Sequence, residues 1–132
     1  MEVNDLLVLE CVTANLKATS KKQALQDLAR RAADVSGLHE RAVFDVLMER
    51  ERLGTTGVGN GIAIPHGKLP NLDRLHGFFA RLKQPIDFQA IDERPVDLIF
   101  VLLAPETSGA DHLKALARIS RLLRDQSICE KL

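Results

Sequence analysis

The spacing of apolar residues in the first part of the chain predicts a helix with one buried face. Between Lys21 and about Asp34, apolar residues recur on one helical face at Ala24, Leu25, Leu28, Ala29 and Ala32. Ser20 and Gln23 have capping-box spacing, in which Ser20 accepts from an early backbone N–H and Gln23 reaches back. Gly37 breaks the pattern and ends the helix.

The same spacing predicts two more helices. The second runs from about His39 to Glu51, and its inward residues are Val43, Val46 and Leu47. The third begins near Ala110, after a loop from Pro105 to Gly109. Its inward residues are Leu113, Leu116, Ile119 and Leu123.

Apolar segments outside these helices predict strands. We expect them near Val8 to Lys17, at Ile62 to Ile64, at Gly77 to Leu82 and at Val96 to Leu103. The last segment is nearly all apolar, as is typical of a central strand covered on both faces. Pro65 has no backbone N–H, so it ends the pairing of the second strand or confines that strand to an edge. The alternation predicts an α/β layered domain, in which helices cover the faces of a sheet.

The segment from Leu53 to Gly61 contains four glycines, and its composition indicates a shaped loop. This loop does not match the common nucleotide-binding patterns. A GxGxxG motif that starts at Gly57 requires glycine at position 62, which is Ile62. A phosphate-binding Walker loop requires Ser or Thr after Gly67-Lys68, and the next residue is Leu69.

Length and charge narrow the class of protein. A chain of 132 residues corresponds to one ordinary domain. The 18 basic and 18 acidic residues give a net charge of zero, so the excess positive charge that drives binding to nucleic acids or anionic lipids is missing. The longest apolar runs are too short to cross a bilayer, no secretory signal is visible, and two cysteines fit a reducing compartment. We therefore expect a cytoplasmic domain that neither inserts into membranes nor binds nucleic acid.

Histidines are the main candidates for chemistry, and the chain has four. None of the spacings typical of a zinc site occurs among them, so no metal is expected. His39 and His76 are expected to be exposed. His66 differs, because Pro65 fixes the backbone before it and Gly67 after it lets another backbone approach closely. This setting suits a nucleophile, although the same residue types suit a histidine that only fills a turn.

Two further residues have more than one interpretation on pattern alone. His112 lies in the first turn of the third predicted helix, where the helix dipole favours a neutral imidazole and Asp111 favours the charged form. A histidine in this position is more often solvated than functional. Arg50 belongs to a run of charged residues at a helix end, which usually indicates a solvated surface.

Taken together, these residues resemble a known family. Arg50-Glu51 and the later run Gly-Val-Gly-Asn-Gly-Ile-Ala-Ile-Pro-His-Gly-Lys-Leu, residues 57–69, closely resemble the enzyme IIA domains of the mannitol/fructose class of the bacterial phosphotransferase system. Pro85 to Phe88, Pro95 to Phe100 and His112 to Leu116 follow in the order expected of that family, so the resemblance covers essentially the whole chain. The part of this run from Gly59 to Leu69 is most similar to the nitrogen-regulatory type of enzyme IIA.

The resemblance implies a fold, a site and partners. The fold is a single enzyme IIA type-2 domain over residues 1–132, with a mixed β-sheet flanked by helices. His66 is the phosphorylated nucleophile, His112 donates a hydrogen bond to the phosphoryl group, and Arg50 stabilises its charge. An HPr-type carrier protein donates the phosphoryl group from a phosphohistidine, and no metal, nucleotide or other cofactor is required. The phosphorylation state then controls regulatory target proteins.

Two alternatives remain open at this point. A sugar-specific enzyme IIA would pass the phosphoryl group to a fructose or mannitol permease domain. A non-catalytic interaction module would accept no phosphoryl group, but the retained set of Arg50, His66 and His112 argues against it. Members of the family also carry a further C-terminal helix. Ser127 and Glu130 have capping-box spacing just before Leu132, so we expect the native chain to continue into that helix.

Overall fold

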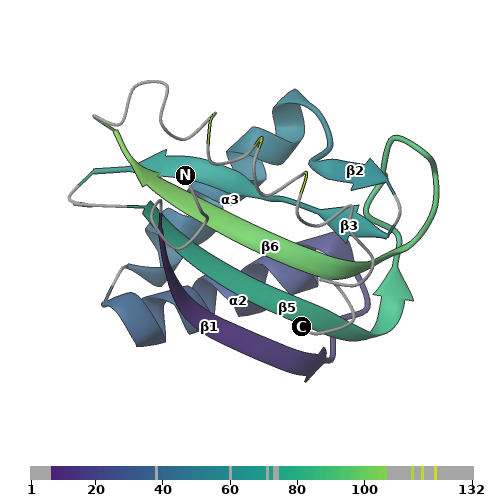
Figure 1. Cartoon of the computed structure of the whole chain (residues 1–132), viewed down its shortest axis with the longest axis horizontal. Helices are drawn as coiled ribbons and strands as arrows, with labels where there is room; N and C mark the ends of the chain where they lie inside the picture. Colours follow the sequence, from purple (N-terminus) through teal and green to yellow (C-terminus); the bar gives the residue numbers. More distant parts are fainter. Residues whose placement is uncertain are drawn as a thin grey trace.

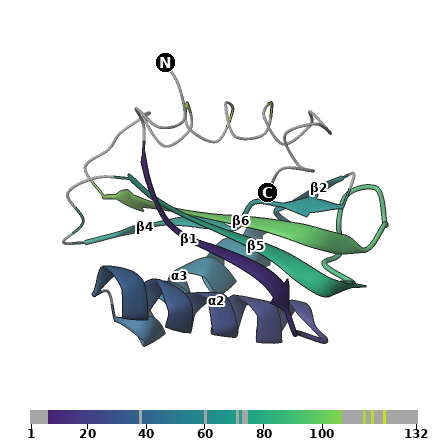
Figure 2. The same ribbon diagram turned by 60° about the horizontal axis from the view of Figure 1, so that its bottom comes forward.

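The computed structural model describes residues 7–37, 39–59, 61–70, 72 and 75–106, together with 114, 117 and 121. In this part of the chain, a six-stranded sheet has the order β1-β5-β6-β3-β2, and β4 pairs with β6 outside that path (Figure 1). Helices α2 and α3 lie side by side on one face of the sheet (Figure 2). The elements are β1 Leu7–Leu16, α2 Lys21–Ser36, α3 Glu40–Leu53, β2 Gly57–Gly59, β3 Ile62–Ala63, β4 His66–Leu69, β5 Leu75–Ile86 and β6 Val96–Pro105.

The first helix begins and ends where the sequence predicts, with one difference in its cap. The backbone N–H of Gln23 donates to Oγ of Ser20 at 3.1 Å, and Gly37 caps the C-terminus with a φ of 74°. Oε1 of Gln23, however, accepts from the backbone N–H of Thr19 at 2.7 Å and from the Thr19 hydroxyl at 2.8 Å. The side chain of Gln23 therefore accepts hydrogen bonds from Thr19, the residue before Ser20, and not from the backbone of Ser20.

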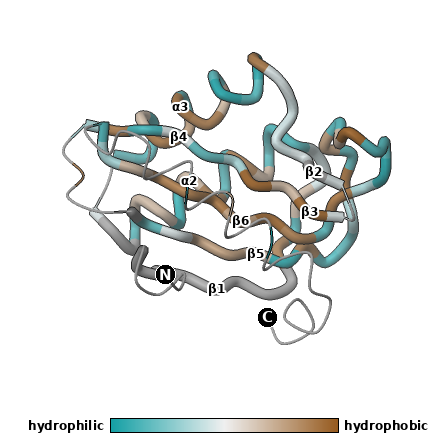
Figure 3. Tube along the Cα trace, turned by 45° about the horizontal axis from the view of Figure 1, so that its top comes forward, coloured by the Kyte–Doolittle hydropathy of each residue, from teal (hydrophilic) through white to brown (hydrophobic). Residues whose placement is uncertain are grey.

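The helices pack their apolar faces against the sheet. All the residues predicted to face inward from α2 are buried, as are Val43 and Leu47 of α3, while Val46 is half-buried and packs on the same core. Figure 3 shows apolar residues concentrated along β6, whereas apolar and polar residues alternate along the helices. Burial of these apolar surfaces is the main force that holds the two layers together.

Strand β6 is the centre of the sheet, as its apolar sequence predicts. It pairs with β5 in antiparallel orientation and with β3 and β4 in parallel orientation. Ile62 pairs with Leu98 and His66 pairs with Leu102, so β3 and β4 follow one register along β6. Pairing stops after β3, as predicted for the segment before Pro65, but it resumes at His66.

Two expectations about the strands are wrong. His76 is buried, because β5 lies between β1 and β6 and His76 pairs with both Val8 and Leu103. Residues Gly57–Gly59, expected to be loop, form the short strand β2 against β3. His39 is exposed, as predicted, and occupies the N-cap position of α3 without a side-chain capping hydrogen bond. In the described part of the chain, no helix is both long and apolar enough to cross a membrane.

Most of the third predicted helix lies outside the described residues. Of its described positions, Lys114, Ala117 and Arg121 are helical and exposed, and none belongs to the predicted inward face. Nε of Arg121 donates to the carbonyl oxygen of Ala117 at 3.4 Å. The inward residues of this helix, and the expected continuation beyond Leu132, stay predictions.

Candidate active site

The imidazole of His66 is held by the backbone just before it. His66 is the first residue of β4 and is half-buried, and its Nδ1 lies 2.9 Å from the carbonyl oxygen of Ile64. A carbonyl oxygen can only accept a hydrogen bond, so Nδ1 is the protonated nitrogen. In the neutral ring, the free electron pair is then on Nε2. In this tautomer, Nε2 is the ring nitrogen that is able to act as a nucleophile.

Arg50 contacts that nitrogen. It lies in the last turn of α3, and its Nε donates to Nε2 of His66 at 3.1 Å. Its Nη1 donates to the carbonyl oxygen of Gly54 at 2.9 Å, which fixes the plane of the guanidinium. Guanidinium nitrogens only donate, so this contact requires the same tautomer as the contact with Ile64. The sequence prediction that Arg50 lies beside His66 agrees with this geometry.

Close packing of α3 on β4 brings the two side chains together. A Cβ placed on Gly67 would lie 1.9 Å from Cγ1 of Val46, in the middle of α3. Only glycine permits this approach, as expected from its position next to His66, although the neighbour is a side chain and not a backbone. The close approach lets the guanidinium of Arg50 reach the imidazole.

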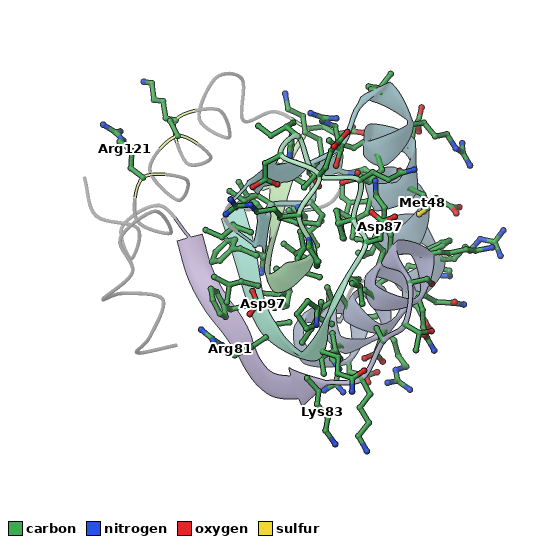
Figure 4. All side chains as sticks on the ribbon, turned by 90° about the vertical axis from the view of Figure 1, so that its right-hand side faces the viewer. Met48, Arg81, Lys83, Asp87, Asp97 and Arg121 are labelled. Atoms are coloured by element: carbon green, nitrogen blue, oxygen red, sulfur yellow. The ribbon has the colours of Figure 1, made fainter. Side chains whose placement is uncertain are left out.

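The turn at Gly61, at the end of the glycine segment, lies away from the imidazole. Gly61 adopts a φ of 79°, and a Cβ there would lie 3.0 Å from Oδ1 of Asp97, at the beginning of β6 (Figure 4). The carbonyl oxygen of Gly61 accepts from the N–H groups of Asp97 and Leu98 at 3.0 Å each. The pairing partners of Ile62 and His66 are Leu98 and Leu102, about 13 Å apart along β6. The turn at Gly61 therefore lies beyond the far end of β3.

Sequence reasoning missed two backbone groups of the site, the carbonyl oxygens of Ile64 and Gly54. No side-chain pattern could reveal them, because every residue carries the same backbone oxygen. It also missed that the carboxylate of Glu51, next to Arg50, is buried. The only sequence signal for this burial is that one side of the charged end of α3 is apolar.

The remaining site predictions concern other residues or ligands. His112 lies outside the described residues, so its role stays a prediction. Among the described residues, no three His, Cys, Asp or Glu side chains are grouped closely enough to hold a metal ion.

Comparison with known proteins identifies the family. The family described as "Phosphoenolpyruvate-dependent sugar phosphotransferase system, EIIA 2" matches residues 5–132. The chain belongs to this family. Its members are phosphotransferase components that take phosphate on a histidine, and the predicted fold class and resemblance are confirmed.

Individual relatives cover nearly all of this enzyme IIA domain. A "Nitrogen regulatory protein" of Bradyrhizobium diazoefficiens is 63% identical over 132 residues, which is 100% of this chain and 86% of the relative. The crystal structure of nitrogen regulatory protein IIA-Ntr from Neisseria meningitidis has a TM-score of 0.87 and 35% identity, and the match covers 97% of this chain and 88% of that one. Mannitol enzyme IIA of Escherichia coli, in its complex with phosphorylated enzyme IIB, shares the fold with a TM-score of 0.76 and 21% identity over 96% of this chain and 88% of that one.

Proposed function

We propose that this enzyme IIA accepts a phosphoryl group on Nε2 of His66 from the phosphohistidine of an HPr-type carrier, and that its phosphorylation state controls partner proteins in the cytoplasm. The observation that carries the site assignment is the pair of contacts on the ring. Nδ1 carries a proton and donates a hydrogen bond to the carbonyl oxygen of Ile64, and Nε2 faces the guanidinium of Arg50. Nδ1 is thus occupied by its proton and hydrogen bond, and Nε2 has a free electron pair beside a cation.

The transfer needs no proton acceptor on this chain. Nε2 attacks phosphorus in line with the bond that breaks, and the donor imidazole leaves with the electron pair of its own P–N bond. As Nε2 shares its electron pair, the ring of His66 gains positive charge. The carbonyl oxygen of Ile64 stabilises that charge through the N–H of Nδ1, which stays in place during the reaction.

Arg50 changes partners during this reaction. Its Nε lies 3.1 Å from Nε2, in the position where phosphorus must arrive. The guanidinium therefore moves from the ring nitrogen to the phosphoryl oxygens, for which its planar set of donors is well suited. Its charge stays at the site throughout, so the incoming negative group meets a preplaced cation. We assign to His112 a hydrogen bond to the same oxygens.

A regulatory role is supported by the name and similarity of the relative with 63% identity, "Nitrogen regulatory protein", which the chain matches over its full length. The physical basis is a change of charge. A phosphoryl group adds about −1.5 to −2 charges to a chain whose net charge is zero. A partner that docks over His66 meets very different surfaces in the two states.

The proposal is tested by incubating the protein with a phosphorylated HPr-type carrier that bears a radioactive phosphoryl group. The intact protein should acquire an acid-labile, alkali-stable label, and His66→Ala should acquire none. His39→Ala is the matched control, because the His39 side chain is exposed and makes no capping hydrogen bond to α3. Equal labelling of the intact protein and His66→Ala would refute the assignment. Rapid onward transfer to a sugar-specific enzyme IIB domain would favour the sugar-transport alternative.

A further inference from the structure

We propose that Glu51 is a positioning residue for phosphoryl transfer, because its buried carboxylate anchors the segment that holds the protonated nitrogen of His66. The inference rests on the proposed function, since it concerns how fast His66 is phosphorylated. Glu51 is adjacent to Arg50 in α3, and the two residues act on opposite nitrogens of the same ring.

Glu51 is a charged residue in an unfavourable place. It is 8% exposed and lies in the last turns of α3, where both burial and the helix dipole disfavour a negative charge. Three donors compensate. The backbone N–H of Thr56 lies 3.2 Å from both carboxylate oxygens, the Thr56 hydroxyl donates to Oε1, and Nζ of Lys21 lies 2.6 Å from Oε2. A residue that breaks local preferences and is fully compensated marks a position with a specific role.

A chain of hydrogen bonds continues from Thr56 to the imidazole. The carbonyl oxygen of Thr56 accepts from the N–H of Ile64 at 3.0 Å. The carbonyl oxygen of Ile64 then lies 2.9 Å from Nδ1 of His66. Arg50, one residue before Glu51, donates to Nε2. Both ring nitrogens are therefore connected to consecutive residues of α3, one directly and the other through Thr56 and Ile64.

Lys21 connects this arrangement to the rest of the fold. It is the first residue of α2, and its side chain is 16% exposed. Its Nζ lies 4.9 Å from the ring centre of Phe88 and 3.5 Å from Oε1 of Gln89. The hydroxyl of Thr55 donates to the carbonyl oxygen of Phe88 at 3.0 Å. The ion pair thus joins the start of α2, the end of α3 and the segment after β5 at one point behind the site.

A positioning role and a merely structural role make different predictions. If Glu51 only stabilises the fold, its loss lowers the free energy of unfolding and leaves the chemistry of the folded protein unchanged. If it positions Ile64 and Arg50 relative to His66, its loss also changes the tautomer of the ring and the rate of the chemical step. Misplacement of reacting groups by about 1 Å can slow a reaction about 100-fold.

The test compares Glu51→Gln with Asp45→Asn, which removes a carboxylate from an exposed ion pair with Arg41 in the same helix. Nitrogen-15 NMR of the unphosphorylated proteins reports which ring nitrogen of His66 carries the proton. We expect Asp45→Asn to match the intact protein. In Glu51→Gln, the Nδ1-protonated fraction should fall, and kcat for phosphorylation by the HPr-type carrier should fall about tenfold or more with little change in KM.

A second pair of variants keeps the test decisive if Glu51→Gln does not fold. Thr56→Val removes the hydroxyl donor, and Thr56→Ser keeps it, so only the valine variant should change the tautomer and slow the transfer. The proposal would be overturned if the tautomer and the rate were unchanged in both Glu51→Gln and Thr56→Val. If Glu51→Gln is unfolded, an unchanged tautomer and rate in Thr56→Val alone would overturn it. The tautomer measurement needs no phosphoryl donor, so it tests the positioning role independently of the proposed function. Failure of the intact protein to accept a phosphoryl group would refute the proposed function separately.

Discussion

Nε of Arg50 donates a hydrogen bond to Nε2 of His66 at 3.1 Å, so the ring nitrogen that has the free electron pair already faces a cation. In the resting protein this contact occupies the electron pair. In the proposed reaction the same guanidinium binds the phosphoryl oxygens, while its Nη1 stays hydrogen-bonded to the carbonyl oxygen of Gly54. The proposal therefore gives Arg50 a role both before and during the reaction.

Replacing Arg50 should slow phosphorylation without changing the phosphorylated residue. We expect Arg50→Ala to reduce the transfer rate about 100-fold, as the loss of a preorganised charged donor does elsewhere. Arg50→Lys should recover only part of the rate, because an ammonium lacks the planar set of donors. Stopped-flow transfer from the phosphorylated carrier measures this, with the exposed Arg52→Ala as the control. Equal rates in Arg50→Ala and Arg52→Ala would exclude the proposed role.

His112 should support the reaction without accepting the phosphoryl group. In His112→Ala we expect the label to remain on His66 and to appear more slowly, because one hydrogen bond to the phosphoryl oxygens is lost. Peptide mapping of the labelled protein under alkaline conditions, carried out at successive times, measures both the position of the label and the rate at which it appears. A label found mainly on His112 in the intact protein would contradict this division of roles.

Gly67 should be required for the packing of α3 on β4. Gly67→Ala places a methyl group on Cγ1 of Val46, and overpacking of this kind destabilises a fold by about 1–3 kcal/mol. Urea denaturation of Gly67→Ala, Val46→Ala and the double variant measures the effect. The double variant should be more stable than the sum of the two single changes predicts. Strict additivity would show that the two residues do not compete for the same space.

Partner binding should depend on the state of His66. Regulatory partners that prefer the unphosphorylated form should bind His66→Ala normally and bind the phosphorylated protein about 5–150-fold more weakly, the usual range for coupled sites. His66→Asp should give a smaller effect in the same direction, because one carboxylate has less charge than a phosphoryl group. Affinity measurements on captured partners test this. Partners that bind both states equally, together with a defect in the uptake of one sugar in a deletion strain, would support the sugar-transport alternative.

The fold could be predicted largely from local patterns. The apolar stripe of α2, its Ser20 cap and the apolar run of β6 each define an element without knowledge of the rest of the chain. β4 and the burial of His76 could not be predicted in this way. Both depend on pairing with strands distant in sequence, and the composition of Gly67 and Lys68 gives no sign of a strand.

The candidate site, too, could be predicted from the sequence only in part. The motif placed Arg50 next to His66, and the structure agrees. The tautomer depends on the carbonyl oxygen of Ile64, and the plane of the guanidinium depends on the carbonyl oxygen of Gly54. These groups are common to all residues, so only the three-dimensional arrangement reveals their role. The turn at Gly61 packs on Asp97, a contact that the composition of the glycine segment does not reveal.

The most direct test of the account is to determine which atom carries the phosphoryl group. Protein with nitrogen-15 histidines, phosphorylated by the HPr-type carrier, can be examined by phosphorus-31 and nitrogen-15 NMR. We expect phosphorus to be coupled to Nε2 of His66, while Nδ1 of the same ring still carries its proton. Coupling to Nδ1 of His66, or to a nitrogen of any other histidine, would contradict it.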